Sequence, residues 1–146
     1  MNNYDVIVIG GGPAGVMTAY ELIEKKPDLK ILVLESGKDI YHRVCPISAG
    51  KVKSCIGCKP CSIMRGFGGA GAFSDGKYNF TTKFGGWLNE YLDDATVMEL
   101  IHYVDDINMK HGAPVKVFTT KGSDIGKRAL DHDLHLLDAN VRHIGT

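Results

Sequence analysis

The sequence has no net charge of either sign and no hydrophobic run long enough to cross a membrane. Its 17 basic residues balance its 17 acidic residues, so charge gives no reason to expect nucleic acid or an acidic membrane surface as a partner. The uncharged run at residues 6–20 is shorter than the about 20 residues that span a bilayer. It also follows Asp5 instead of the basic segment that opens a signal peptide. We therefore expect no nucleic-acid or membrane partner and a cytoplasmic location.

Several chemical signatures are absent as well. The chain contains no H-E-x-x-H motif and no recognisable nucleophile, base and orienting group, so nothing favours hydrolase chemistry. Internal repeats and low-complexity segments are also missing. What remains is 146 residues with 44% hydrophobic and 23% charged residues, a composition typical of one soluble globular domain.

Glycine, in contrast, is abundant: 18 residues, half of them at 10–15 and 66–76. The first group lies between two apolar, β-branched runs, at residues 5–9 and 30–35, which read as strands buried in a parallel sheet. Apolar positions at helical spacing over residues 13–26, with Pro13 in the first turn, predict a helix between them. The order strand, glycine turn, helix, strand predicts a parallel βαβ unit of the α/β class.

The turn at residues 10–15 fits the G-x-G-x-x-G pattern of dinucleotide-binding proteins. Gly10 permits the tight turn, Gly12 allows the pyrophosphate to approach the backbone, and Gly15 allows helix and strand to pack closely. Glu35, at the end of the second strand, is placed to accept hydrogen bonds from ribose hydroxyls, and its charge argues against a 2′-phosphate. The pattern is shared by FAD and NAD sites. The predicted contacts are Gly10, Gly12, Pro13, Ala14, Gly15, Glu35 and Ser36.

The four cysteines lie at C-x9-C-x2-C-x2-C spacing in a stretch rich in lysine and arginine. Three thiols at this interval resemble the start of a ferredoxin cluster motif. Zinc, a redox dithiol whose thiol pKa is lowered by neighbouring lysines, and no cofactor at all are the alternatives. The candidate metal ligands are Cys45, Cys55, Cys58 and Cys61.

A second glycine-rich run occupies residues 65–77 and is similar to the flavoprotein loop that passes beneath the flavin-side phosphate. On that resemblance Gly68 and Gly69 allow close approach, Ser74 supplies a hydroxyl and Lys77 a positive charge. We treat residues 37–78 as a cysteine- and glycine-rich insertion in a single domain, 1–146.

The remaining sequence predicts a few further elements. Thr96 and Glu99 form a capping-box pattern at the start of an apolar helical stripe that ends near Gly112. A strand is expected at 115–119 and a weaker helix at 123–132. Short strands are expected at 134–137 and 141–144.

These motifs together resemble the N-terminal part of a bacterial and archaeal family of FAD-dependent dehydrogenases, also described as NAD(P)/FAD-dependent oxidoreductases. The resemblance is carried by the segments 8–15, 45–50, 55–61, 68–77, 85–88 and 141–146. It implies a Rossmann-like FAD/NAD(P)-binding fold with a parallel sheet, FAD as cofactor, and oxidoreductase activity on a small-molecule substrate or electron partner. Because members of that family are several hundred residues long, it also implies an incomplete fold, the N-terminal fragment of such an enzyme. An iron–sulfur or redox-cysteine centre would add a second redox group. The alternatives are a catalytically inactive nucleotide- or metal-binding module and an NAD-binding dehydrogenase domain.

Overall fold

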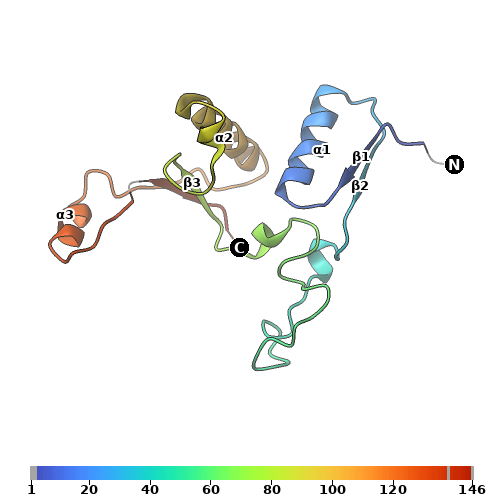
Figure 1. Cartoon of the computed structure of the whole chain (residues 1–146), viewed down its shortest axis with the longest axis horizontal. Helices are drawn as coiled ribbons and strands as arrows, with labels where there is room; N and C mark the ends of the chain where they lie inside the picture. The colour runs from blue at the N-terminus through green and yellow to red at the C-terminus, as the bar shows by residue number, and fades with distance from the viewer. Residues whose placement is uncertain (1–2, 138, 146) are drawn as a thin grey trace. The chain divides into compact units, whose positions relative to one another are not determined.

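The computed structural model describes residues 3–137 and 139–145 and divides the chain into two compact units, Met1–Ser74 and Asp75–Thr146. Figure 1 shows their elements in chain order. The boundary falls inside the predicted insertion at 37–78. The assignment of 1–146 to one domain stays a prediction, and Thr146, the last residue of the resembling segments, lies outside the described residues.

The first unit contains the predicted βαβ unit. Strands β1 (Val6–Ile9) and β2 (Ile31–Leu34) pair in parallel, and helix α1 (Pro13–Lys25) connects them and contacts both. Pro13 occupies the first turn of α1, where its missing N–H has no intrahelical acceptor to lose. The predicted element order and the parallel pairing are therefore confirmed.

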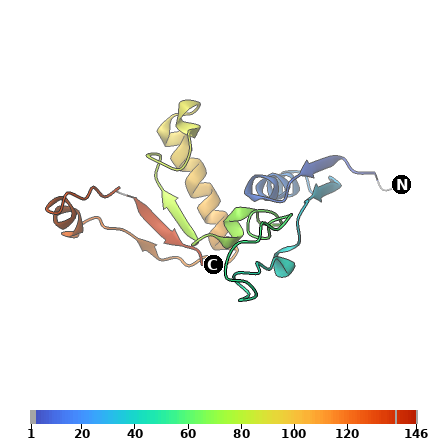
Figure 2. The same cartoon turned by 60° about the horizontal axis from the view of Figure 1, so that its bottom comes forward.

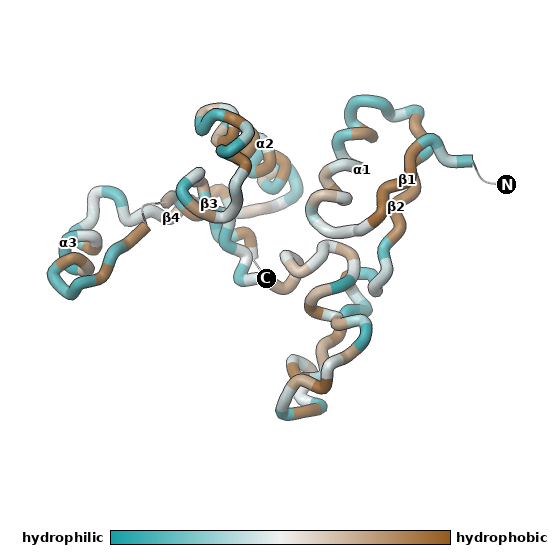
Figure 3. Tube along the Cα trace, viewed as in Figure 1, coloured by the Kyte–Doolittle hydropathy of each residue, from teal (hydrophilic) through white to brown (hydrophobic). Residues whose placement is uncertain are grey.

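The expected burial of both strand faces is wrong for this structure. Alternate side chains along β1 are exposed, and Ile9 is 86% exposed. The register pairs Ile9 with Leu34, which is also exposed. Figure 3 shows the continuous hydrophobic colour of both strands. The reason is that α1 covers one face of this two-stranded sheet and no described element of the first unit covers the other.

A long irregular segment follows β2. Between the short 3-10 turns η1 (Ile40–His42) and η2 (Ala70–Phe73), residues 43–69 form neither helix nor strand, as the loss of sequence periodicity predicts. Figure 2 shows this segment as a series of loops. It carries all four cysteines and the first five residues, 65–69, of the second glycine-rich run.

The second unit is built on an antiparallel sheet in the order β3-β5-β4. Its strands are β3 (Lys77–Phe80), β4 (Val117–Phe118) and β5 (Asn140–His143), and its helical segments are η3 (Leu88–Glu90), α2 (Asp94–Lys110) and α3 (Ile125–Leu130). The strand at 141–144 and the helix at 123–132 are confirmed with shifted ends, and the strand at 115–119 shrinks to β4. Residues 134–137 are not a strand, and β3 was not predicted. The fold class is thus α/β, compatible with a partial Rossmann-like FAD-binding fold. No helix in the described part of the chain is long and apolar enough to cross a membrane.

Helix α2 begins earlier than the capping-box pattern predicts. Its N-cap is Asp93, whose carboxylate accepts hydrogen bonds from the backbone N–H of Thr96 at 2.9 Å and from its hydroxyl at 2.8 Å. Thr96 therefore lies in the first turn instead of capping the helix. Aspartate is a stronger N-cap than threonine, and Asp93 lies only three residues before Thr96.

The second unit is held together by a buried ion pair as much as by apolar packing. Val97 and Ile107 of α2 are the buried apolar side chains among the described residues. Beside them, Arg142 of β5 donates from Nε and Nη2 to the two carboxylate oxygens of Asp105 at 2.6 and 2.8 Å, and both residues are at most 5% exposed.

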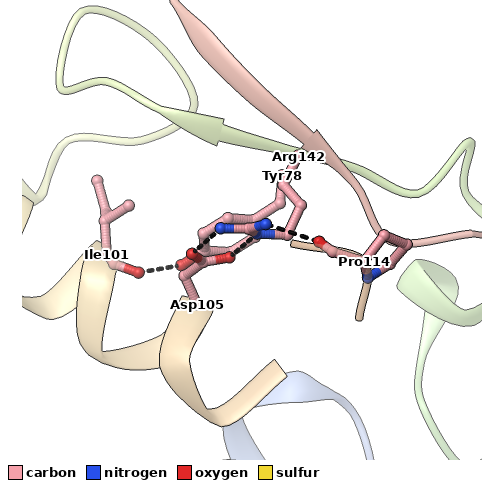
Figure 4. A network of polar contacts seen from close by, with 5 residues as sticks. All are labelled: Tyr78, Ile101, Asp105, Pro114 and Arg142. Carbon is pink, nitrogen blue, oxygen red and sulfur yellow. Dashed lines mark hydrogen bonds and ion pairs between the residues drawn. The ribbon is translucent and has the colours of Figure 1, made fainter. Parts of the chain in front are cut away.

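Two further contacts extend this ion pair, as Figure 4 shows. Arg142 Nη1 donates to the carbonyl of Pro114 at 2.6 Å, and the hydroxyl of Tyr78 donates to the carbonyl of Ile101 at 2.7 Å. Burial, with the nearby charge of Asp105, raises the pKa of Tyr78 to about 12. The network fastens α2 to the sheet, which accounts for Arg142 without any role at a cofactor.

Candidate functional site

The glycine turn at residues 10–15 has the close packing that the motif predicts. A Cβ added at Gly15 would lie 1.8 Å from the carbonyl oxygen of Gly10 and 3.3 Å from the Val8 side chain. No larger residue fits there without moving the turn away from β1. At Gly12, by contrast, the nearest atom to an added Cβ is Gly69 Cα at 3.9 Å. The space beside Gly12 is therefore open, at the end of α1 where the first backbone N–H groups have no intrahelical acceptor.

Glu35 fixes this turn through its carboxylate. Oε2 accepts a hydrogen bond from the N–H of Gly11 at 2.8 Å, and Oε1 accepts one from the N–H of Gly37, also at 2.8 Å. These bonds, the one from Gly11 first, lower the pKa of Glu35 from its ordinary value. The Ser36 hydroxyl is a weaker donor to Oε1 at 3.4 Å. Glu35 is thus a charged group held directly beside the glycine turn.

The two glycine-rich segments meet within the first unit. The N–H of Gly68 donates to the carbonyl of Gly11 at 2.8 Å. At Gly69, which has a φ of 60°, an added Cβ would lie 3.0 Å from Cδ of Pro13 and 3.2 Å from Cα of Gly12. A side chain at this position would be strained and would crowd the start of α1. The structure therefore brings together Gly12, Pro13, Gly68 and Gly69, four of the predicted contacts.

The last two predicted contacts, Ser74 and Lys77, are placed differently. Ser74 ends η2, and its N–H donates to the carbonyl of Gly71 at 3.1 Å. Lys77 belongs to β3 in the second unit, where its ammonium lies 2.9 Å from the Asp75 carboxylate. Their contacts to a cofactor stay predictions.

Arg43 is an organising residue that the sequence analysis missed. Its side chain is 4% exposed and donates to three backbone carbonyls, those of Ser62, Ile63 and Phe67, at 2.9, 2.8 and 2.6 Å. Its guanidinium carbon also lies 4.6 Å from the centre of the Phe73 ring. Arg43 thus fixes the backbone just before and within the second glycine-rich loop. No acidic residue accompanies it in the sequence between 40 and 74, so no charge pattern could have identified its partners.

All four cysteines line one small apolar cavity in the first unit. No disulfide is formed, Cys55 is exposed and the other three are half-buried. Within the residues that the structure describes, no three His, Cys, Asp or Glu side chains are placed to hold a metal ion. The iron–sulfur and zinc interpretations therefore gain no support from the structure, and the role of the four cysteines stays a prediction.

Known proteins resemble the part of the chain that carries this site. Residues 1–40 match the Thi4 family. The mitochondrial L-2-hydroxyglutarate dehydrogenases of Dictyostelium discoideum and Homo sapiens are 37% and 36% identical to this chain over 60 and 62 residues. These matched segments cover 41% and 42% of this chain. A thiamine thiazole synthase of Phaeosphaeria nodorum is 52% identical over 33 residues, 23% of this chain and 10% of the relative. No solved structure matches the chain significantly.

These relatives are of the FAD-dependent oxidoreductase type, and the similarity lies in the N-terminal part of the chain. The resemblance predicted from the motifs is confirmed for that part. The matched segment spans 14% and 13% of the length of the two dehydrogenases. The similarity therefore concerns the βαβ unit with its glycine turn and does not extend to the relatives' remaining sequence.

Proposed function

We propose that this chain is the FAD-binding N-terminal part of an FAD-dependent oxidoreductase. The observation that carries the proposal is the open space beside Gly12, bordered by Gly69 and by the start of α1. A pyrophosphate fits such a place for two reasons. The N-terminus of a helix presents free N–H groups and a partial positive charge, and the glycines leave no side chain in the way.

Glu35 suits the adenosine end of the same cofactor. Each of its carboxylate oxygens has two acceptor positions, and the backbone bonds from Gly11 and Gly37 use one on each oxygen. Oε2 keeps a second position for one ribose hydroxyl, and on Oε1 the other hydroxyl would replace the weak contact from Ser36 at 3.4 Å. The same negative charge would repel a 2′-phosphate, so FAD and NAD fit this carboxylate better than NADP.

The choice between FAD and NAD rests on the relatives. A bound FAD would supply the hydride or electron chemistry, while the residues of this chain bind and orient it. The main alternatives are an NAD-binding dehydrogenase domain and a module that binds a nucleotide or metal without turnover. The substrate or electron partner, the cytoplasmic location, and an iron–sulfur cluster at the four cysteines stay predictions. The dehydrogenase relatives are mitochondrial by name.

The test is a direct titration of the 146-residue chain with FAD and, separately, with NAD. We expect saturable FAD binding that is tighter than NAD binding. The Gly12→Ala variant should bind FAD at least about tenfold more weakly, because its methyl group would occupy the space of the pyrophosphate; tenfold corresponds to about 1.4 kcal/mol. The measurement is quenching of flavin fluorescence, with calorimetry as a second readout.

Gly126→Ala is the matched control. Gly126 lies in α3, an added Cβ there meets nothing within 4 Å, and its φ is not positive. This variant should bind FAD as the unchanged chain does. Equal FAD affinity for Gly12→Ala, in a protein whose circular dichroism is unaltered, would show that the pyrophosphate lies elsewhere. Tight NAD binding without FAD binding would favour the dehydrogenase-domain alternative. Iron, sulfide and zinc analysis of protein purified without air tests the metal interpretations on the same sample.

A further inference from the structure

The cavity between the four cysteines is small and has no charged lining. Its volume is about 30 Å³, room for one or two water molecules. Besides the thiols, its wall consists of one serine and four aliphatic or proline side chains: Pro46, Ile47, Val52, Ile56 and Ser62. Four cysteine residues thus line one confined apolar space although they come from positions up to 16 residues apart, from Cys45 to Cys61.

The sequence around this cavity carries positive charge and no negative charge. The sequence contains no acidic residue between Ile40 and Ser74, whereas three lysines, at 51, 53 and 59, are interspersed among the cysteines, all of them exposed. At Cys45 alone, hydrogen bonds to the sulfur from the backbone N–H groups of Ser48 and then Ile47 lower the pKa of the thiol. Thiolate is the form that attacks a disulfide.

The segment is also anchored at both ends of the cysteine run. Arg43, two residues before Cys45, donates to the carbonyls of Ser62 and Ile63, which follow Cys61 directly. The N–H groups of Met64 and Arg65 in turn donate to the Cys61 carbonyl at 3.2 and 2.9 Å. The run is therefore closed into a loop by Arg43.

The size of the cavity and the spacing of the cysteines suit thiol chemistry better than a resident cluster. The cavity is too small for a cluster of four iron and four sulfide ions, which needs more room than one or two water molecules. In contrast, C-x-x-C spacing occurs twice, at 55–58 and 58–61, and one thiol of the first pair is exposed while the other is half-buried.

We propose that Cys45, Cys55, Cys58 and Cys61 form a thiol–disulfide redox site that exchanges with small-molecule disulfides. The exposed Cys55, as thiolate, attacks one sulfur of the small disulfide. A mixed disulfide forms, the original S–S bond breaks, and one small thiolate leaves and takes up a proton. The Cys58 thiolate then attacks the sulfur of Cys55 and expels the second small thiol. Two protein thiols are oxidised to one disulfide by two electrons, and the small disulfide is reduced to two thiols. Cys45 and Cys61 are the further thiols to which this disulfide can pass.

The experiment follows the thiols of the fully reduced 146-residue chain as oxidised glutathione is added, without flavin. At each step the free thiols are alkylated, and intact mass and peptide mapping give the number and position of the disulfides. We expect thiols to disappear in pairs, with a Cys55–Cys58 disulfide first and full reversal by dithiothreitol. The Cys55→Ser variant should react at least about tenfold more slowly.

Ser54→Ala is the matched control, because Ser54 is exposed, directly precedes Cys55 and does not line the cavity; it should oxidise like the unchanged chain. The proposal is overturned if all four thiols survive a large excess of oxidised glutathione. It is also overturned if glutathione stays attached as single mixed disulfides, or if stoichiometric zinc or iron protects the thiols from alkylation. The measurement on the unchanged chain stands even if a variant fails to fold. Since no flavin takes part, a negative result here leaves the FAD proposal unaffected, and the converse also holds.

Discussion

At the scale of single residues, Glu35 and Arg43 build the candidate site by opposite means. The Glu35 carboxylate accepts hydrogen bonds from the backbone N–H groups of Gly11 and Gly37. The Arg43 guanidinium donates hydrogen bonds to the backbone carbonyls of Ser62, Ile63 and Phe67. Each satisfies loop backbone that has no partner in a helix or a sheet. The glycine-rich loops of the first unit therefore derive their shape from these two charged side chains.

The bonds to Glu35 make the stability of the glycine turn depend on pH. Because the pKa of Glu35 is lowered in the folded chain, the carboxylate contributes stability above its ordinary value of 4.5. That contribution is lost as the pH falls through the lowered pKa. We expect the Glu35→Gln variant to melt at a lower temperature than the unchanged chain at pH 7, and the difference to shrink steadily below pH 4.5. Thermal melts between pH 3 and 7 measure it.

Ser36→Ala is a suitable control for this prediction. Ser36 makes only the weak contact of 3.4 Å to the same carboxylate, so its removal should change the melting temperature little at any pH. The melting temperatures of Glu35→Gln and the unchanged chain could instead differ by the same amount from pH 7 to pH 3. That result would mean that the ionised carboxylate is not the stabilising form.

At the scale of elements, sequence periodicity predicted the helices and strands that the local sequence determines. It missed the elements and contacts that depend on residues far away in the sequence. The order and direction of β1, α1 and β2 follow from apolar runs separated by a glycine turn, and these were predicted nearly to the residue. Strand β3 was missed because it is formed by pairing with β5, some sixty residues later in the chain. The ion pair of Arg142 was not predicted for the same reason, since its partner Asp105 is 37 residues away.

Asp105 and its neighbour Asp106 offer a matched test of how α2 is attached. Asp105→Asn removes the charge that compensates the buried guanidinium of Arg142, whereas Asp106 is exposed. Loss of one partner of a buried ion pair is strongly destabilising. We expect the Asp105 variant to lower the folding equilibrium constant of the second unit by roughly a hundredfold or more, measured by urea unfolding. Asp106→Asn should stay within about 0.5 kcal/mol of the unchanged chain. Equal effects of the two variants would contradict the importance of the ion pair.

At the scale of the whole molecule, the chain leaves much apolar surface uncovered. Its accessible surface is 11138 Å². Two separate globular domains, each of half its mass, would together expose about 8,900 Å². The excess exists although the sequence is 44% hydrophobic, and Ile9 with Leu34 on the open face of β1 and β2 is one part of it. The sequence therefore predicted apolar strands correctly, but their burial needs covering elements that the described residues of the first unit do not supply.

This exposure should be measurable in solution through the open face of the first unit. We expect the 146-residue chain to bind an apolar fluorescent dye such as ANS under native conditions. The Ile9→Lys variant should reduce the dye signal and leave the folding free energy within about 0.5 kcal/mol, since a side chain that is 86% exposed packs against little. Val8→Lys is the contrasting variant, because Val8 is the alternate residue of β1 and lies on the face toward Gly15 of α1. A charge there should unfold the βαβ unit. If Ile9→Lys were as damaging as Val8→Lys, the face that carries Ile9 would be covered in solution.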